Sequence, residues 1–162
     1  MSSLLPSRHL PLIALFLGCV LGLSACAINP ATGQANIVTM SEKRELEIGA
    51  EEHAKVMQSM ALLSDDELNA YVNEVGQRLA AVSDRPDLDF KFTIIDSPEI
   101  NAFALPGGYV YINRGLLVYL NSEAELAAVL GHEIGHITAR HAVQQQSRGS
   151  LARVASGVGG VV

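Results

Sequence analysis

The sequence predicts an α+β domain that is mostly α-helical and carries a small sheet or hairpin. Three segments begin with the Ser/Thr-x-x-Glu form of a capping box, which marks the first turn of a helix. One run, residues 90–96, alternates apolar and polar side chains for most of its length, as a half-buried strand does. Pro106-Gly107-Gly108 separates two further β-prone runs. A length of 162 residues suits one domain of this class.

Residues 1–25 are predicted to be a lipoprotein signal peptide. Their apolar run, residues 12–23, is shorter than the roughly 20 residues that span a bilayer, and it follows a basic residue. Leu23-Ser24-Ala25-Cys26 resembles a bacterial lipobox, so Cys26 is the expected lipidation site. The alternative is an ordinary signal peptide that ends beside a cysteine. We therefore expect an exported, periplasmic protein that is lipid-anchored to a membrane, and Ala27 in place of Asp fits the outer membrane.

The composition of the exported chain argues against a disulfide-bonded protein and against a nucleic-acid-binding protein. Cys19 would leave with the signal peptide and Cys26 would carry lipid, so no pair of thiols remains for a disulfide. Beyond residue 25 the chain has 10 basic and 17 acidic residues, so we expect no nucleic-acid partner. Residues 26–40 are polar and turn-rich and are predicted to be a tether, which leaves residues 41–162 as the folded domain.

The first two helices follow two of the capping boxes. Thr39-Met40-Ser41-Glu42 predicts a helix from residue 41 to about residue 60. His53 lies on it beside two glutamates, which indicates a solvated helix face; a metal ligand is the alternative. Ser64-Asp65-Asp66-Glu67 opens a second, amphipathic helix. Its predicted core stripe consists of Leu68, Tyr71, Val72, Val75, Leu79 and Val82.

The remaining elements surround the Pro-Gly-Gly sequence. Residues 90–96 are predicted to form a strand, and residues 101–117 a hairpin, because the two glycines permit positive φ at the turn. Ser122-Glu123-Ala124-Glu125 is the third capping box. No proline follows it before about Gln146, so we expect one uninterrupted helix up to that residue.

This third helix carries the candidate active site. His132-Glu133-Ile134-Gly135-His136 is the H-E-x-x-H pattern of zinc peptidases. Residues four apart lie on one face of a helix, so His132 and His136 can bind one Zn²⁺, which leaves a coordination position for water. Glu133 can reach that water as the general base. The alternative is a helix with two surface histidines.

The third protein ligand of the metal is not evident from the motif. On a continuous helix His141 points away from His132, and Glu125 lies roughly 10 Å up the axis, so neither is expected to close the site. Arg140 and His141 are expected to support the site or to pack against it, and a direct catalytic role is the alternative.

Two segments together resemble a known family. NAFALPGGYVYINRGLL and ELAAVLGHEIGHITARHAVQQ are similar to BepA-like periplasmic proteases of the HtpX-type and CAAX-protease-type zinc endopeptidases. The resemblance implies a gluzincin-like fold with a small sheet and a third ligand, a Glu, on a later helix. It also implies a strand that pairs with the substrate backbone, here Tyr109, Val110, Tyr111 and Ile112. No acidic residue follows Glu133, so we expect a partial domain that lacks its C-terminal part.

The function expected from these features is zinc-dependent endoproteolysis of exported or misfolded envelope and outer-membrane proteins, with one Zn²⁺ per chain. Residues 26–162 alone, without the third ligand, are expected to bind zinc weakly and to show little or no peptidase activity. The protein substrates and, through the lipid anchor, the membrane are the expected partners. The alternative is a lipoprotein chaperone or assembly factor whose metal site is incomplete or idle.

Overall fold

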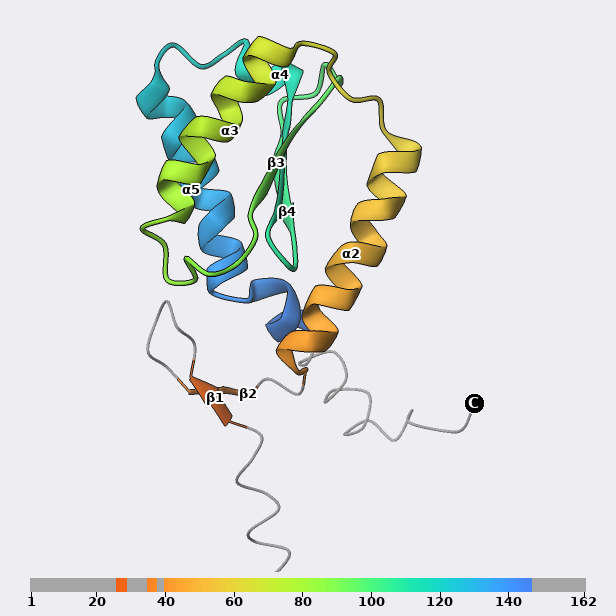
Figure 1. The fold of residues 1–162 in the computed structure, drawn as a ribbon, viewed down its shortest axis with the longest axis vertical. Coiled ribbons are helices and arrows are strands. Elements are labelled where there is room, and N and C mark those ends of the chain that lie inside the picture. Colours follow the sequence, from red (N-terminus) through yellow and green to blue (C-terminus); the bar gives the residue numbers. More distant parts are fainter. Residues whose placement is uncertain (1–25, 29–34, 38–39, 147–162) are drawn as a thin grey trace, which may run out of the picture.

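The computed structural model describes residues 26–28, 35–37 and 40–146. It confirms the predicted class, a mostly helical α+β fold with a small mixed sheet (Figure 1). The predicted signal peptide and the segment after residue 146 lie outside the described residues. The elements in chain order are β1 (Cys26–Ile28), β2 (Ala35–Ile37), α2 (Glu42–Ser59), α3 (Asp66–Ala80), β3 (Lys91–Ile95), β4 (Ala102–Leu105), β5 (Tyr109–Asn113), α4 (Arg114–Leu117) and α5 (Glu123–Thr138). None of the described helices combines the length and apolar character needed to cross a membrane.

The predicted tether contains a short antiparallel ribbon that the sequence did not indicate. Strands β1 and β2 pair with each other, and Cys26 is opposite Ile37.

Side-chain caps fix the starts of the three long helices, although two caps differ from the predicted ones. Ser122 accepts a hydrogen bond from the backbone N–H of Glu125, as predicted. Ser41 rather than Thr39 caps α2, and Asp65 rather than Ser64 caps α3. Each of these two residues accepts from the backbone N–H three positions later, so the observed caps lie two residues and one residue after the predicted ones.

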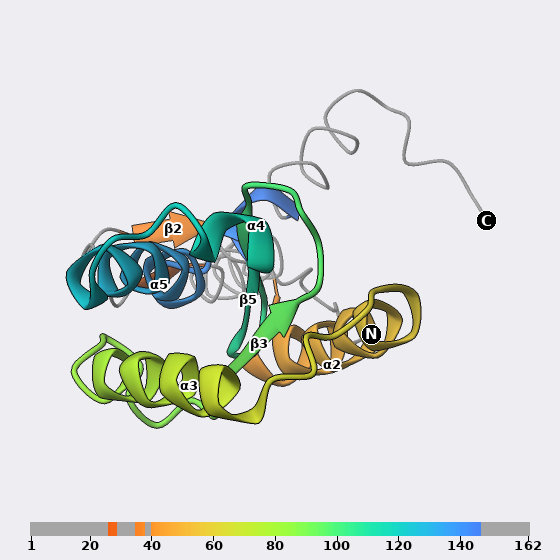
Figure 2. The ribbon, with the colours of Figure 1, turned by 90° about the horizontal axis from the view of Figure 1, so that it is seen from above.

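The sheet has the strand order β3-β5-β4, with β5 parallel to β3 and antiparallel to β4. Gly107 and Gly108 form the β4–β5 turn at φ values of 84° and 99°, which confirms the hairpin prediction. Helices α3 and α5 cover one face of the sheet, and α2 lies along the other (Figures 1 and 2). The site helix α5 therefore packs beside the edge strand β4.

The hydrophobic core lies between the sheet and the helix pair α3 and α5. Val72 and Val75 of the predicted stripe are buried in it, whereas Tyr71 is partly exposed and Val82 lies beyond the end of α3, 83% exposed. Residues of α5 complete the core at helical spacing. They are Leu126, Leu130, Ile134 and Ile137. This stripe fixes the rotation of α5 about its axis and thereby the direction of its histidines.

Candidate active site

His132 and His136 converge on one point beside the core stripe of α5. Their Nε2 atoms are 3.0 Å apart, and the two rings meet edge to face at a centroid distance of 4.6 Å. Two imidazole nitrogens this close can both reach a single Zn²⁺ at the usual Zn–N distance of about 2.0–2.1 Å. The two residues therefore fit the predicted metal.

Glu133 is nearly buried, with 8% of its surface exposed, yet its carboxylate has no hydrogen bond or ion pair with any described residue. Every described side-chain oxygen or nitrogen that is fully buried does have a hydrogen-bond partner. The carboxylate oxygens of Glu133 must therefore reach the solvent. A carboxylate that is sheltered, unpaired and open to water suits a general base.

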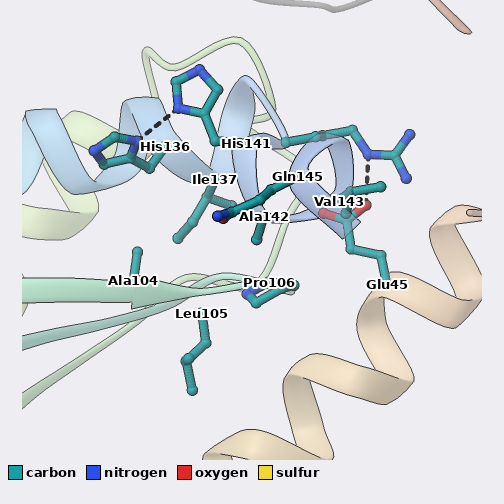
Figure 3. Close-up of a pocket in the computed structure, with 11 residues that line it drawn as sticks. Glu45, Ala104, Leu105, Pro106, His136, Ile137, His141, Ala142, Val143 and Gln145 are labelled. Carbon is teal, nitrogen blue, oxygen red and sulfur yellow. Dashed lines mark hydrogen bonds and ion pairs between the residues drawn. The ribbon is translucent and has the colours of Figure 1, made fainter. Parts of the chain in front are cut away.

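The prediction of one continuous helix to residue 146 is wrong. Helix α5 ends at Thr138, Arg140 has a left-handed backbone with φ 56°, and residues 141–146 are helical again. The break redirects His141, so that its Nδ1 lies 2.7 Å from Nδ1 of His136 (Figure 3). His141 therefore does not face away from the site, contrary to the prediction from a continuous helix.

Even so, His141 contacts the wrong side of His136 to share a metal with it. The contact is made to Nδ1, whereas the nitrogen that faces His132 is Nε2. Glu125 stays at the start of α5, where its carboxylate accepts from the backbone N–H of Asn121 at 2.6 Å. Among residues 40–146 and the two short strands before them, no group of three His, Cys, Asp or Glu side chains is placed to hold a metal ion.

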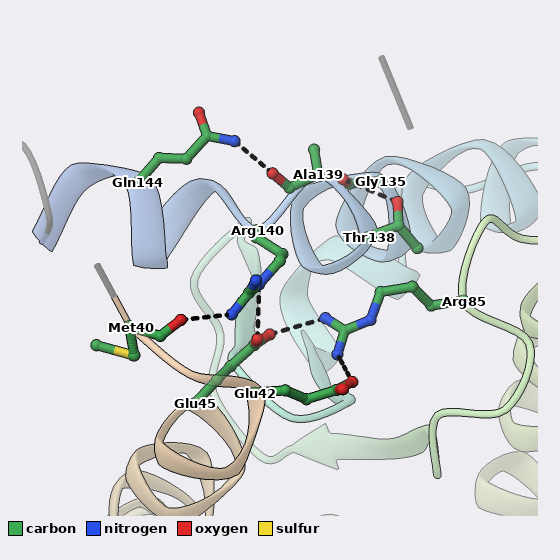
Figure 4. Close-up of polar contacts among 9 residues, drawn as sticks. All are labelled: Met40, Glu42, Glu45, Arg85, Gly135, Thr138, Ala139, Arg140 and Gln144. Carbon is green, nitrogen blue, oxygen red and sulfur yellow. Dashed lines mark hydrogen bonds and ion pairs between the residues drawn. The ribbon is translucent and has the colours of Figure 1, made fainter. Parts of the chain in front are cut away.

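Arg140 is held by a buried carboxylate from the first long helix. Glu45 of α2, 1% exposed, accepts from Nε of Arg140 at 2.8 Å and from Nη1 of Arg85 at 2.8 Å (Figure 4). Burial by itself would lower the pKa of Arg85, but its hydrogen bonds and ion pairs with Glu45 and Glu42 outweigh burial and raise that pKa. Arg140 therefore packs against the N-terminal end of α2, and its supporting role stays a prediction.

The predicted substrate-binding residues lie in the centre of the sheet. Tyr109 to Ile112 form most of β5, which is hydrogen-bonded to β3 on one side and to β4 on the other. The side chains of Val110, Tyr111 and Ile112 are each 1% exposed. This position leaves β5 no free edge for another strand, so the role of pairing with a substrate does not suit it.

The strand with a free outer edge beside α5 is β4, which was not predicted to bind the substrate. Asn113 N–H donates to Asn101 C=O at 2.9 Å, and hydrogen-bonded pairs alternate along an antiparallel ladder. The backbone groups of Phe103 and Leu105 therefore point to β5, and those of Ala102 and Ala104 point outward. No described residue forms a backbone hydrogen bond with this outer edge.

Two hollows follow that edge and meet the motif. One, of about 410 Å³, is lined by Ala102 together with His132 and Glu133. The other, of about 260 Å³, is lined by Ala104 together with His136 and His141 (Figure 3). The small side chains of the two alanines leave room between β4 and α5. The free strand edge, the histidine pair and Glu133 therefore border two hollows that lie along β4.

His53 is neither on a solvated face nor near the motif. Its Nδ1 lies 2.6 Å from the hydroxyl of Tyr111, and its ring stacks on Tyr109 at a centroid distance of 4.3 Å. Burial, followed by the charge of Lys91, lowers the pKa of His53. Burial, followed by Tyr109, raises the pKa of Tyr111 to about 12. This cluster joins α2 to the sheet face opposite α5, and His53 is not placed to bind the metal.

Comparison with known proteins agrees with this geometry. Residues 66–161 match the sequence profile described as peptidase family M48. The chain is 36% identical over 122 residues to a beta-barrel assembly-enhancing protease of Yersinia pestis and 35% identical over 122 residues to that of Escherichia coli K12. Each alignment covers 74% of this chain and 25% of the relative.

A mitochondrial protein is similar to a shorter part of the chain. The metalloendopeptidase OMA1 of Schizosaccharomyces pombe is 44% identical over 75 residues, which is 46% of this chain and 22% of that protein. The chain thus spans about a quarter of the length of the curated relatives it matches. Since the family profile covers more than half of the chain, including the H-E-x-x-H helix, the chain belongs to peptidase family M48, a family of zinc-dependent metallopeptidases.

Proposed function

We propose that this chain is a zinc-dependent endopeptidase that binds extended segments of envelope proteins along β4 and cleaves them beside α5. The observation that carries the proposal is that the histidine pair and the solvent-accessible carboxylate of Glu133 line the hollows beside a free strand edge. Each part has a separate role in peptide hydrolysis, and all of them lie where α5 meets β4.

The chemistry divides between the metal and the protein. A Zn²⁺ ion bound by His132 and His136 would supply a Lewis acid and lower the pKa of water to roughly 7. Glu133 takes the proton from the attacking water and delivers it to the nitrogen of the leaving amine. Its nearly buried position strengthens its electrostatic interactions, and because no described residue pairs with it, both oxygens can accept that proton.

A substrate segment binds as a fourth strand. The outward N–H and C=O groups of Ala102 and Ala104 offer main-chain hydrogen bonds to an extended peptide. Such pairing is independent of sequence and needs an unfolded segment, which suits substrates that have failed to fold or assemble. The peptide bond to be cleaved would then lie near His132 and Glu133, which border the hollow at Ala102.

The proposed substrate class rests on the names of the relatives, and the proposed location rests on the N-terminal sequence. Two relatives are called beta-barrel assembly-enhancing proteases, which supports envelope and outer-membrane proteins as substrates. The lipobox-like sequence that ends at Cys26 supports export to the periplasm and a lipid anchor, with the outer membrane as its place. The third ligand of the zinc, for which the described residues offer no candidate, is proposed to be a Glu outside them.

The central experiment replaces Glu133 by Gln, with Glu125→Gln as the matched control on the same helix. In a version of the protein that includes the third ligand, Glu133→Gln should lower the rate of casein cleavage by about 10²- to 10⁴-fold, because the general base is lost while the histidines remain. Zinc per chain after dialysis should be unchanged in both variants. Full proteolysis by Glu133→Gln, or equal losses in the two variants, would refute the assignment.

A chaperone or assembly factor with an idle metal site is the second candidate function. It is favoured by the absence of a third metal ligand among the described residues, because the edge of β4 can bind a client without any metal. Cells that depend on this protein for envelope assembly distinguish the two functions. Undiminished rescue by Glu133→Gln would favour the chaperone, and loss of rescue would favour the peptidase.

A further inference from the structure

The turn that ends α5 has an arginine where helices usually have a glycine. Ala139 is the C-cap, and Arg140 follows it with φ 56°. This position is commonly left-handed and commonly glycine, because a side chain makes the conformation unfavourable. The backbone therefore gives no reason for an arginine, and the reason must lie in the contacts of its side chain.

Those contacts anchor the turn to the N-terminal end of α2. Nε of Arg140 donates to Oε2 of Glu45 at 2.8 Å, and Nη2 donates to the backbone C=O of Met40 at 3.2 Å (Figure 4). The other oxygen of Glu45 is occupied by Arg85. The carboxylate is thus buried, and each of its oxygens pairs with a different arginine. It cannot rotate away from Arg140 without breaking an ion pair.

The left-handed turn at Arg140 also determines where His141 lies. On an uninterrupted helix, residues 136 and 141 differ by about 140° around the axis and do not meet. The left-handed residue between them brings Nδ1 of His141 to 2.7 Å from Nδ1 of His136. One of these two nitrogens must carry the shared hydrogen.

Metal binding requires one particular arrangement of that hydrogen. His136 can bind through Nε2 only if its proton is on Nδ1, and Nδ1 then donates to His141. In metalloproteins such a hydrogen bond fixes the tautomer and the ring orientation of the ligand histidine. His141 provides the acceptor at the required place.

We propose that His141, Arg140 and Glu45 are positioning residues for the metal ligand His136: the Glu45–Arg140 ion pair holds the left-handed turn, and the turn places His141 to accept the Nδ1–H of His136. The inference rests on the proposed metal site. It assigns these three residues no contact with the substrate, and it gives the Thr-Ala-Arg-His sequence after the motif a physical role.

The first test uses the tautomer of His136 in the metal-free chain, observed by ¹⁵N NMR of the imidazole nitrogens. Wild type should show His136 protonated at Nδ1. His141→Ala should shift the population toward the Nε2-protonated form, and His141→Asn, whose amide oxygen can take the place of the acceptor, should restore it. His141 is exposed, so both variants should fold.

The second test is a titration with Co²⁺, followed by its visible absorption. His141→Ala should weaken binding roughly 10- to 100-fold, the usual cost of removing such a partner, and His141→Asn should recover part of the loss. Arg140→Gly, which keeps the left-handed turn accessible but removes the ion pair, should weaken binding by a smaller factor. Arg78→Gln, which removes the exposed ion pair between α3 and Glu123 of α5, is the control and should leave binding unchanged.

The outcomes separate this inference from the proposed function. A wild-type chain that binds no Co²⁺ would refute the metal site, while the tautomer measurement would still decide the role of His141. An unchanged tautomer and unchanged Co²⁺ affinity in His141→Ala would overturn the inference even if wild type binds metal. If Arg140→Gly and Arg78→Gln bind Co²⁺ with equal affinity, Arg140 and Glu45 do not help to position His136.

Discussion

Gly49→Ala should destabilise the domain although alanine is the better helix former. Gly49 lies in the middle of α2, where it packs directly against the hairpin. A methyl group there would stand 1.9 Å from the carbonyl oxygen of Pro106 and 2.7 Å from its carbon. Both are backbone atoms, so no side-chain rotation relieves the clash, and α2 and the hairpin must separate.

Three contributions determine the size of the effect. Overpacking of this kind costs about 2 kcal/mol. Separation also strains the hydrogen bond between His53 and Tyr111, which contributes about 1 kcal/mol. The higher helix propensity of alanine offsets about 1 kcal/mol. The net loss is about 2 kcal/mol, or roughly 8 °C in Tm for a domain of this size.

Gly131→Ala in α5 is the matched control. A methyl group there meets no described atom within 4 Å, so only the helix propensity changes. We expect this variant to gain up to about 1 kcal/mol, roughly 4 °C in Tm. Thermal unfolding followed by circular dichroism gives both values. A Gly49→Ala domain as stable as wild type, or shifted in the same direction as Gly131→Ala, would refute the close approach of α2 to the hairpin.

The other predictions concern charge, pH and the anchor. Glu45→Ala should lower the free energy of unfolding by about 3–5 kcal/mol in urea titrations, because Arg140 loses its carboxylate partner and Arg85 keeps only Glu42, whereas Glu123→Ala should cost under about 1 kcal/mol. Since the pKa of Tyr111 is about 12 in the folded state, above roughly 10 when unfolded, the folded state keeps a proton that the unfolded chain loses. Stability should therefore fall between pH 10 and 12, and Tyr111→Phe should flatten this part of the pH profile; an unchanged slope would contradict the assignment. Labelled palmitate should enter wild type and not Cys26→Ser, and a cleaved but unlabelled wild type would rule out the anchor.

Local sequence was sufficient to place the helices and the motif. The capping boxes located all three long helices, because a side chain that accepts a backbone hydrogen bond acts within one turn. They did not identify Ser41 and Asp65 as the caps, since neighbouring residues offer equivalent oxygens. The spacing of His132 and His136 correctly placed both on one face, because helix geometry is itself local.

The features that depend on distant residues could not be predicted in this way. The hairpin sequence indicates two strands but not which of them becomes the edge, because that depends on the parallel pairing of β5 with β3. No glycine or proline at Arg140 indicates from the sequence that the helix breaks there. The buried carboxylate of Glu45, 95 residues earlier, pairs with the side chain of Arg140. Neither the periodicity nor the composition of the sequence indicates such a contact.

That separation also has a consequence for the order in which the domain folds. Glu45 and Arg140 enclose most of the described chain, and closing so long a loop is entropically unfavourable. Contacts between such distant residues therefore form late, after the hairpin and the helices have formed locally. During synthesis, α2 leaves the ribosome long before Arg140, which follows α5, has been added to the chain. We therefore expect the H-E-x-x-H helix to acquire its final ending only after the local elements have formed.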